Sequence, residues 1–238
     1  MDGITEKFSV FDFFNLIIGG VVFILGLWVC SPSQIADFYT STVNIANNSW
    51  FSIFLAVVSF LGIALVFGMV ITEIAHLIFD TKFHLEKTLI ETSLNKNQLI
   101  KNSTKLAKFR QKAQAYLNVD QRELDNDFTT DECSAYFAYC VYYLHVHGQD
   151  KKTEKLREAQ SLSELLTIVF VLIPISSIAL HILAGAACLV IKPTVLLYLM
   201  FAVFALIFLR RSKRAMENRI KMVLAVYDAC VDMNSNRD

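Results

Sequence analysis

One connector in this chain contains no lysine or arginine, although the whole sequence has 22 of these residues. The connector, Ser31–Ser49, joins the first two of four apolar stretches, which are Phe11–Cys30, Trp50–Phe79, Leu165–Ile191 and Pro193–Leu209. Lys7 precedes the first stretch, thirteen basic residues lie between the second and third, seven follow the fourth, and Lys192 lies in the tight turn between the last two. Lysine and arginine are disfavoured in translocated loops, so this distribution predicts that both termini and the central segment lie on the cytoplasmic side of a membrane.

Two further absences limit how the chain is processed. The five cysteines include no C-x-x-C pair, and four of them fall in predicted cytoplasmic or bilayer positions, so we expect reduced thiols and no disulfide framework. The leader Met1–Asp12 has one lysine against three acidic residues, and no A-x-A site follows the first stretch. A cleaved signal peptide has the opposite charge, so we expect the first stretch to be retained as a helix.

The common motifs of enzymes and nucleotide-binding proteins are also missing. The sequence has no G-x-x-x-x-G-K-[ST], H-E-x-x-H, G-x-S-x-G or G-x-G-x-x-G. An active site built from scattered residues stays open. We nevertheless expect a protein that is not an enzyme, with no catalytic residues, no cofactor and no metal.

The chain does contain long runs of apolar residues. Hydrophobic residues make up 55% of the sequence, and they gather in runs long enough to cross a hydrocarbon core of about 30 Å. We therefore predict an all-α integral membrane protein with four transmembrane helices in two hairpins and a helical cytoplasmic insert. The predicted segments are a first hairpin (1–79), a helical cytoplasmic domain (80–162), a second hairpin (163–209) and a cytoplasmic C-terminal helix (210–238).

Local signals add detail to this plan. Ala64 and Gly68 form a small-xxx-small pair, which allows another helix to approach closely. Thr129 and Glu132 have the spacing of a capping box, and Gly148 is expected to end the helix that this box begins. Pro174 predicts a kink in the third span. The amphipathic tail after Leu209 is expected to continue the fourth helix as a cytoplasmic stalk.

Glu73, His76, Asp80 and His84 recur on one face of the helix predicted to cross the inner membrane surface. Glu-x-x-His is the spacing with which helical bundles present metal ligands, but such sites need a second copy on another helix, and the chain has none. A polar seam between helices or subunits, a solvated face, and a metal or proton-relay site all remain open. We retain Glu73 and His76 as pore or gate candidates.

His181 is predicted near the middle of the bilayer, because it lies ten residues, or about 15 Å, from the outer turn. Ionisable side chains at that depth usually face the interior of a bundle or a water path. Two interpretations stay open: a neutral histidine bonded to a neighbouring helix, and a pore-lining or gating residue.

Lys101, Lys105, Lys108 and Lys112 form a basic stripe along one predicted cytoplasmic helix. The stripe fits contact with anionic lipid, a solvated face, or a binding site for an anionic signal such as a nucleotide or nucleic acid. Arg210–Arg214 forms a second basic cluster at the membrane edge, where lipid anchoring is the expected role.

The segment Phe11–Gly20, which reads FDFFNLIIGG, resembles the opening Y/F-D-F-F-x-x-L-I-P-G of small four-span membrane effectors from bacterial phage-defence loci, a family in which the Hailong-type membrane subunit is one candidate relative. Gly19 stands where that family often has proline, and the rest of the chain is similar in layout only. The resemblance implies a protein of the bacterial inner (cytoplasmic) membrane that permeabilises or depolarises it once a nucleotide or oligonucleotide from a partner enzyme is sensed. It carries over no catalytic residues.

From these observations we expect an oligomeric, gated membrane effector, either a pore or another depolarising protein. Four helices fill their own centre, so a water path needs several copies of the chain. The expected partners are the lipid bilayer, further copies, an anionic signal and a cytosolic partner enzyme. The alternatives are a membrane-anchored scaffold, which recruits cytosolic proteins through its tyrosine-rich helix, and a small proton-coupled transporter that uses His181 and Glu73.

Overall fold

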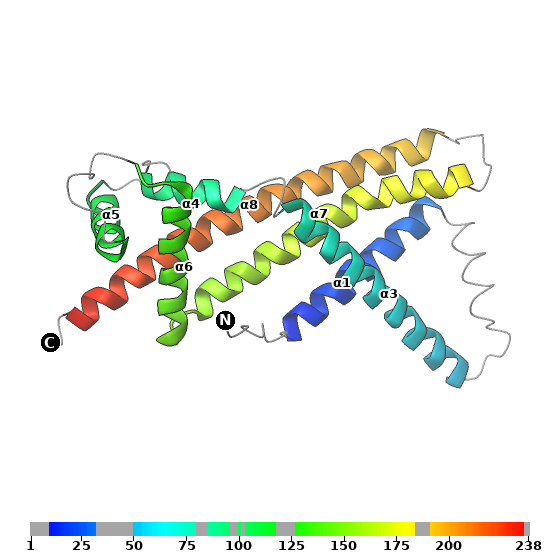
Figure 1. The fold of residues 1–238 in the computed structure, drawn as a ribbon. Coiled ribbons are helices and arrows are strands. Elements are labelled where there is room, and N and C mark those ends of the chain that lie inside the picture. The colour runs from blue at the N-terminus through cyan, green and yellow to red at the C-terminus, as the bar shows by residue number, and fades with distance from the viewer. Residues whose placement is uncertain are drawn as a thin grey trace. The chain divides into compact units, whose positions relative to one another are not determined.

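The computed structural model describes residues 10–31, 50–79, 85–95, 100, 103–117, 127–183 and 191–235. In these ranges the chain is helical and has no strand, which confirms the all-α prediction (Figure 1). The helices are α1 (Val10–Cys30), α3 (Trp50–Ile78), α4 (Leu85–Asn95), α5 (Ser103–Leu117), α6 (Thr130–Val146), α7 (Lys151–Leu183) and α8 (Ile191–Ser235). Four of them, α1, α3, α7 and α8, are long and apolar enough to cross a membrane.

The chain divides into two compact units, and each unit combines two separate segments. Unit 1 contains Met1–Ile78 and Ser161–Arg211, and unit 2 contains Phe79–Gln160 and Ser212–Asp238. The predicted first and third segments thus belong to one unit, and the second and fourth to the other. As a result α7 and α8 each contribute one part to unit 1 and the other part to unit 2.

Within unit 1, α1 and α3 cross at two glycines (Figure 1). A Cβ atom on Gly20 would lie 1.7 Å from the backbone oxygen of Ala64, and a Cβ atom on Gly68 would lie 1.9 Å from that of Leu16. No other residue type fits at such distances, so the two backbones touch directly. This confirms that the Ala64/Gly68 pair admits a close neighbouring helix, and it identifies the neighbour as α1.

The other contacts of unit 1 join α7 to α1 and α8. A Cβ atom on Gly26 of α1 would lie 2.4 Å from Ile173 Cδ1, so α7 packs closely against this glycine. The ring of Phe170 on α7 lies 5.4 to 6.0 Å from three phenylalanine rings of α8, Phe201, Phe204 and Phe208. α7 continues through Pro174 as one helix.

Unit 2 is built around a single apolar core. It is formed by α4, α5, α6, Phe128 and the last part of α8, and its buried members are Ile90, Leu94, Phe109, Ala113, Phe128, Cys133, Tyr136, Phe137, Cys140, Leu144, Met216, Ile220, Val223, Leu224 and Tyr227. The tail after Leu209 continues the fourth helix, as predicted, and its last part is packed inside this core. The sequence pattern shows an amphipathic face but not what covers it.

The local signals around α6 agree with the structure. Thr129 accepts from the backbone of Glu132, and the Glu132 carboxylate accepts from the backbone of Thr129, so the capping box is confirmed. α6 ends at Val146, and Gly148 adopts φ of 64°, a left-handed conformation that favours glycine. This confirms Gly148 as the residue that ends the helix.

Candidate functional site

A chain of hydrogen-bonded polar side chains lies inside unit 1, near the ends of three helices. The hydroxyl of Ser177 on α7 lies 2.9 Å from that of Tyr198 on α8 and 2.8 Å from that of Ser31, the residue after α1. Ser31 Oγ in turn lies 3.4 Å from His181 Nδ1. Ser31 and Ser177 are completely buried, so these bonds replace those that water would make. We call these four residues the polar cluster.

The geometry of the polar cluster shows which ring nitrogen of His181 carries a hydrogen. His181 Nδ1 lies 2.7 Å from the backbone oxygen of Ser177, four residues earlier in α7. A carbonyl oxygen accepts but never donates, so Nδ1 carries the hydrogen. In a neutral imidazole the other nitrogen, Nε2, is then an acceptor. The polar cluster therefore ties three apolar helices together and leaves one basic nitrogen for a further partner.

His181 lies beside the end of α1, and its depth in a bilayer stays a prediction. Its neighbour Ser31 directly follows Cys30, the last residue of α1, so the histidine lies level with one end of that helix. The expected depth came from counting residues back from Lys192, and 184–190 lie outside the described part of the chain. Near a helix end an ionisable group is less costly than at mid-bilayer.

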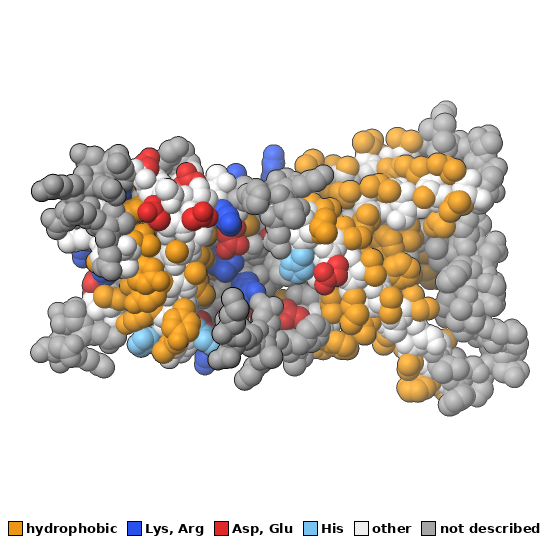
Figure 2. Space-filling view, in the orientation of Figure 1, with side chains coloured by type: hydrophobic (Ala, Val, Ile, Leu, Met, Phe, Trp, Pro, Cys, Tyr) orange, Lys and Arg blue, Asp and Glu red, His pale blue; other side chains and the backbone are white. Residues whose placement is uncertain are grey.

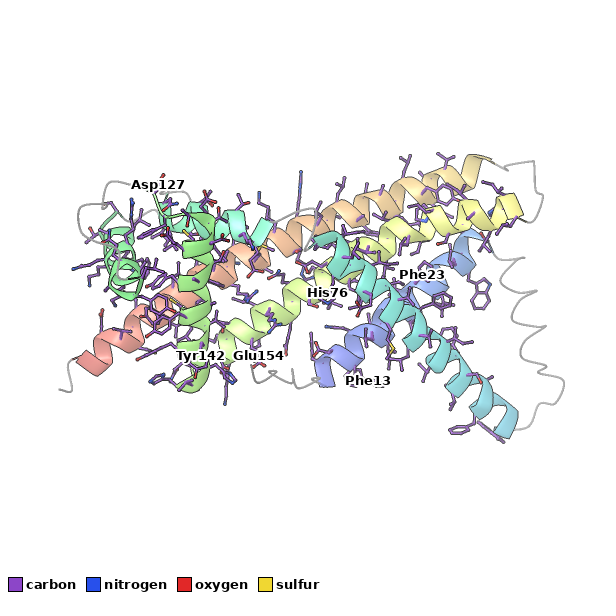
Figure 3. The ribbon with its side chains drawn as sticks, in the orientation of Figure 1. Phe13, Phe23, His76, Asp127, Tyr142 and Glu154 are labelled. Atoms are coloured by element: carbon purple, nitrogen blue, oxygen red, sulfur yellow. The ribbon has the colours of Figure 1, made fainter. Side chains whose placement is uncertain are left out.

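Glu73 and His76, the other pore or gate candidates, lie near the last turns of α3 and are exposed (His76 is labelled in Figure 3). They therefore stand on the surface of unit 1 and not within its packed interior. Asp80 and His84, which completed the predicted face, lie outside the described residues. No group of three histidine, cysteine, aspartate or glutamate side chains in the described ranges could hold a metal ion.

The structure gives the lysines of the predicted basic stripe different surroundings. Lys105 and Lys108 are exposed on α5, and Lys101 lies outside the described residues. Lys112 Nζ instead donates to carboxylates on the last part of α8, to Asp228 Oδ1 and, at 3.0 Å, to Asp232 Oδ1. Lys112 therefore joins α5 to α8 within unit 2. We call this group the α5–α8 ion pair.

Charges within the α5–α8 ion pair shift the pKa of both partners in the directions that strengthen it. Burial alone lowers the pKa of Lys112, but the hydrogen bonds and charges of Asp228 and Asp232 outweigh burial and raise it above 10.5. The hydrogen bond and charge of Lys112 lower the pKa of Asp232 below 3.8. Lys112 and Asp232 are thus both charged at neutral pH.

Two other features of unit 2 bear on its chemistry. Cys133 and Cys140 are buried in the core, and burial raises the pKa of each thiol to about 12. Such thiols stay protonated at neutral pH and react slowly. The four cysteines within the described residues are all free, and Cys188 lies outside them.

Comparisons with known protein families, with curated proteins and with solved structures find no match to this chain. Its function must therefore be argued from its own geometry.

Sequence reasoning did not identify five of the residues that these sites use. Ser31, Ser177 and Tyr198 complete the polar cluster, and Asp228 and Asp232 complete the α5–α8 ion pair. The aspartates carried a detectable signal, because their spacing of four puts both on one face of a helix. Serine and tyrosine near span ends are common and carried none.

Proposed function

We propose that the chain is an integral membrane protein whose four long helices cross the bilayer in unit 1. Large apolar side chains are exposed on every helix of that unit, among them Trp28, Phe54, Val171 and Leu196. Figure 2 shows hydrophobic side chains over much of its visible surface. Monomeric proteins in water rarely expose such an area, because its transfer from water is favourable. Lipid chains are the natural covering.

The proposed orientation puts both termini and unit 2 in the cytoplasm, with Ser31–Ser49 outside. It rests on the lack of lysine and arginine in that connector. The resemblance of Phe11–Gly20 to phage-defence effectors makes the bacterial inner membrane the proposed location.

The function that we propose is a gated effector that makes the membrane permeable to ions, with unit 2 as the regulatory part. One observation carries this proposal: α8 is an unbroken helix of 45 residues. Its first part bears the exposed apolar side chains of unit 1, and its last part supplies five members of the unit 2 core. In this proposal a rearrangement of that core is passed to the fourth span along α8.

The α5–α8 ion pair is the proposed lock of the resting state. An anion that binds Lys105, Lys108 and Lys112 competes with Asp228 and Asp232 for the Lys112 ammonium. Binding then releases α5 from α8. Because Lys112 is available to the anion only in the released state, the anion binds that state more tightly than the locked one, and gating requires such a difference in affinity. A nucleotide or oligonucleotide made by a partner enzyme has the necessary charge.

The conducting form in this proposal is a homo-oligomer. The interior of unit 1 is filled by side chains such as Ala64, Val169 and Ile173, which have no exposed surface or almost none. A path for ions therefore forms between copies. Glu73 and His76, exposed near the end of α3, are then candidates for a polar seam between them.

The test is to remove the α5–α8 ion pair by substitution, with no anionic ligand present. The double variant Asp228→Asn, Asp232→Asn is reconstituted in liposomes loaded with a potassium-sensitive dye, and ion release is measured. Loss of both carboxylates removes the partners of Lys112, so we expect release at least about tenfold above that of the unmodified chain, which corresponds to about 1.4 kcal/mol of bias.

The matched control is Asp131→Asn, Glu154→Gln, which removes two negative charges elsewhere in unit 2. It is expected to leave ion release at the basal level. Equal release from both variants would mean that the charge change and not the lock is responsible. Intact liposomes with the unlocked variant would contradict the gating proposal.

A small proton-coupled transporter is the second candidate, and the polar cluster is the observation that favours it. Hydroxyl groups in a bonded series can pass a proton, and His181 has one nitrogen free to accept one. Proton-driven solute uptake that is lost on His181→Ala, with no dye release from unlocked liposomes, would favour this function over the effector.

A further inference from the structure

The four cations that follow the fourth span differ from three cations elsewhere in unit 2, each of which lies beside a carboxylate. Arg219 donates to Glu86 at 3.2 Å, Lys112 takes part in the α5–α8 ion pair, and Arg110 lies 3.8 Å from Asp127. Arg210, Arg211, Lys213 and Arg214 are exposed, and none of them forms an ion pair with a residue in the described ranges. Four positive charges therefore stand together within five residues.

These four cations share one face of α8. A helix turns by about 100° per residue, so the four side chains spread over roughly 160° of its circumference. Ser212, between them in sequence, points to the opposite face and is buried. The cations are thus arranged side by side and directed outward.

The same face continues along the preceding span. Its exposed apolar side chains, Leu196, Leu199, Met200, Val203, Leu206 and Ile207, fall within the arc that the cations occupy when the helix is wound at about 100° per residue. Phe201 and Ala205 lie opposite and are buried, like Ser212. One outward stripe of a single helix therefore changes from apolar to cationic between Ile207 and Arg210.

We propose that this stripe is a binding site for anionic phospholipid, with the acyl chain along the apolar part and the headgroup phosphate on Arg210, Arg211, Lys213 and Arg214. Arginine presents a planar fork of donors that fits phosphate oxygens, and three of the four residues are arginine. A soluble anion would gain only the charges, whereas a lipid also covers Leu206 and Ile207. The ligand is therefore a bilayer lipid and not free phosphate.

The inference rests on the membrane-spanning part of the proposed function but not on gating. The purified chain, held in a neutral detergent, is mixed with equal amounts of phosphatidylglycerol and phosphatidylcholine. Native mass spectrometry then measures which lipids the chain retains. Basic residues are attracted to anionic headgroups, so we expect at least about a tenfold preference for phosphatidylglycerol.

The decisive variant is Arg210→Gln, Arg211→Gln, Lys213→Gln, Arg214→Gln, which should retain the two lipids equally. Its matched control, Lys87→Gln, Lys151→Gln, Lys155→Gln, Lys221→Gln, removes the same charge from other exposed positions and should keep the preference. Replacing the three arginines with lysine should weaken the preference without abolishing it.

Two further measurements use the unmodified chain, so their results do not depend on whether the variants fold. Raising the salt concentration should reduce the preference, because exposed charges are screened. Inorganic phosphate at millimolar concentration should not displace phosphatidylglycerol, and displacement would identify a soluble anion as the ligand.

Other outcomes overturn the inference in distinguishable ways. Two results contradict the lipid site alone. One is equal retention of both lipids by the unmodified chain, and the other is an unchanged preference in the variant Arg210→Gln, Arg211→Gln, Lys213→Gln, Arg214→Gln. A chain that remains in solution without detergent contradicts the lipid site and the membrane proposal together.

Discussion

The two units of this protein use apolar side chains in opposite ways. Unit 2 buries large aliphatic and aromatic residues in one core, and most of its described lysines are exposed. Unit 1 buries small residues such as Ala64 against glycine and exposes large ones such as Leu196 and Trp28. This difference is what the proposed arrangement requires, in which unit 1 faces lipid and unit 2 faces water. α7 and α8 meet both requirements along their length.

The largest loss of stability is expected in unit 1, where the backbones of α1 and α3 touch. Gly68→Ala puts a Cβ atom 1.9 Å from the oxygen of Leu16, so α1 and α3 must separate. Overpacking usually costs about 1–3 kcal/mol, and the rigid backbone here puts the expected loss at about 3 kcal/mol or more. Thermal unfolding of the purified, detergent-bound chain measures it. Gly62→Ala in the same helix meets nothing within 4 Å, and it should change stability by less than about 1 kcal/mol.

A matched pair of substitutions tests the two solvents directly. Leu199 in unit 1 and Val146 in unit 2 are each 59% exposed. In a bilayer a lysine in place of Leu199 should cost about 2.5–3.5 kcal/mol, and in water a lysine in place of Val146 should cost almost nothing. The fraction of chain inserted into membranes, followed with glycosylation or protease reporters, measures the first effect. If Leu199→Lys inserts as well as Val146→Lys, unit 1 does not face lipid.

A smaller effect is expected at the start of α6. Thr129→Ala removes one acceptor of the capping box and should destabilise unit 2 by about 1 kcal/mol. Denaturant unfolding, followed by tyrosine fluorescence, should detect the change. Thr129→Ser keeps the hydroxyl and should recover most of the loss. Unit 1 should be unaffected, since the cap lies wholly in the other unit.

The smallest effect concerns acid. The pKa of Asp232 lies below 3.8 in the folded chain, so its carboxylate stabilises unit 2 above that value and stops doing so as the pH falls through the lower folded pKa. The pKa of Lys112 lies above 10.5, so its contribution disappears only at higher pH. A double-mutant cycle of Lys112→Gln and Asp232→Asn should therefore show coupling near neutral pH, and the coupling should be lost as the pH falls through the lowered pKa of Asp232. Coupling that persists in acid would mean that the two residues do not interact as charges.

Much of the fold could be predicted because its signals are local. Apolar length identified the four long helices, the threonine–glutamate spacing identified the capping box, and the Ala64/Gly68 pair predicted a close helix neighbour. Each depends on residues within a few turns of one another, where the geometry of a helix is known in advance.

The partners across the chain could not be predicted for the opposite reason. Lys112 meets Asp228 across 116 residues, and Ser31 meets Ser177 across 146. Such contacts depend on which helices pack together and at what level, which one sequence does not specify. The same limit made Lys112 look like a member of an exposed stripe.

The division of α8 between the two units also sets an order of events on the ribosome. The part of α8 that completes the core of unit 2 is translated after α4, α5 and α6, and after the fourth apolar segment has emerged. Until then those three helices lack Ile220, Val223 and Leu224, around which they pack. The core of unit 2 in each newly made chain can therefore be completed only after the fourth apolar segment has left the ribosome.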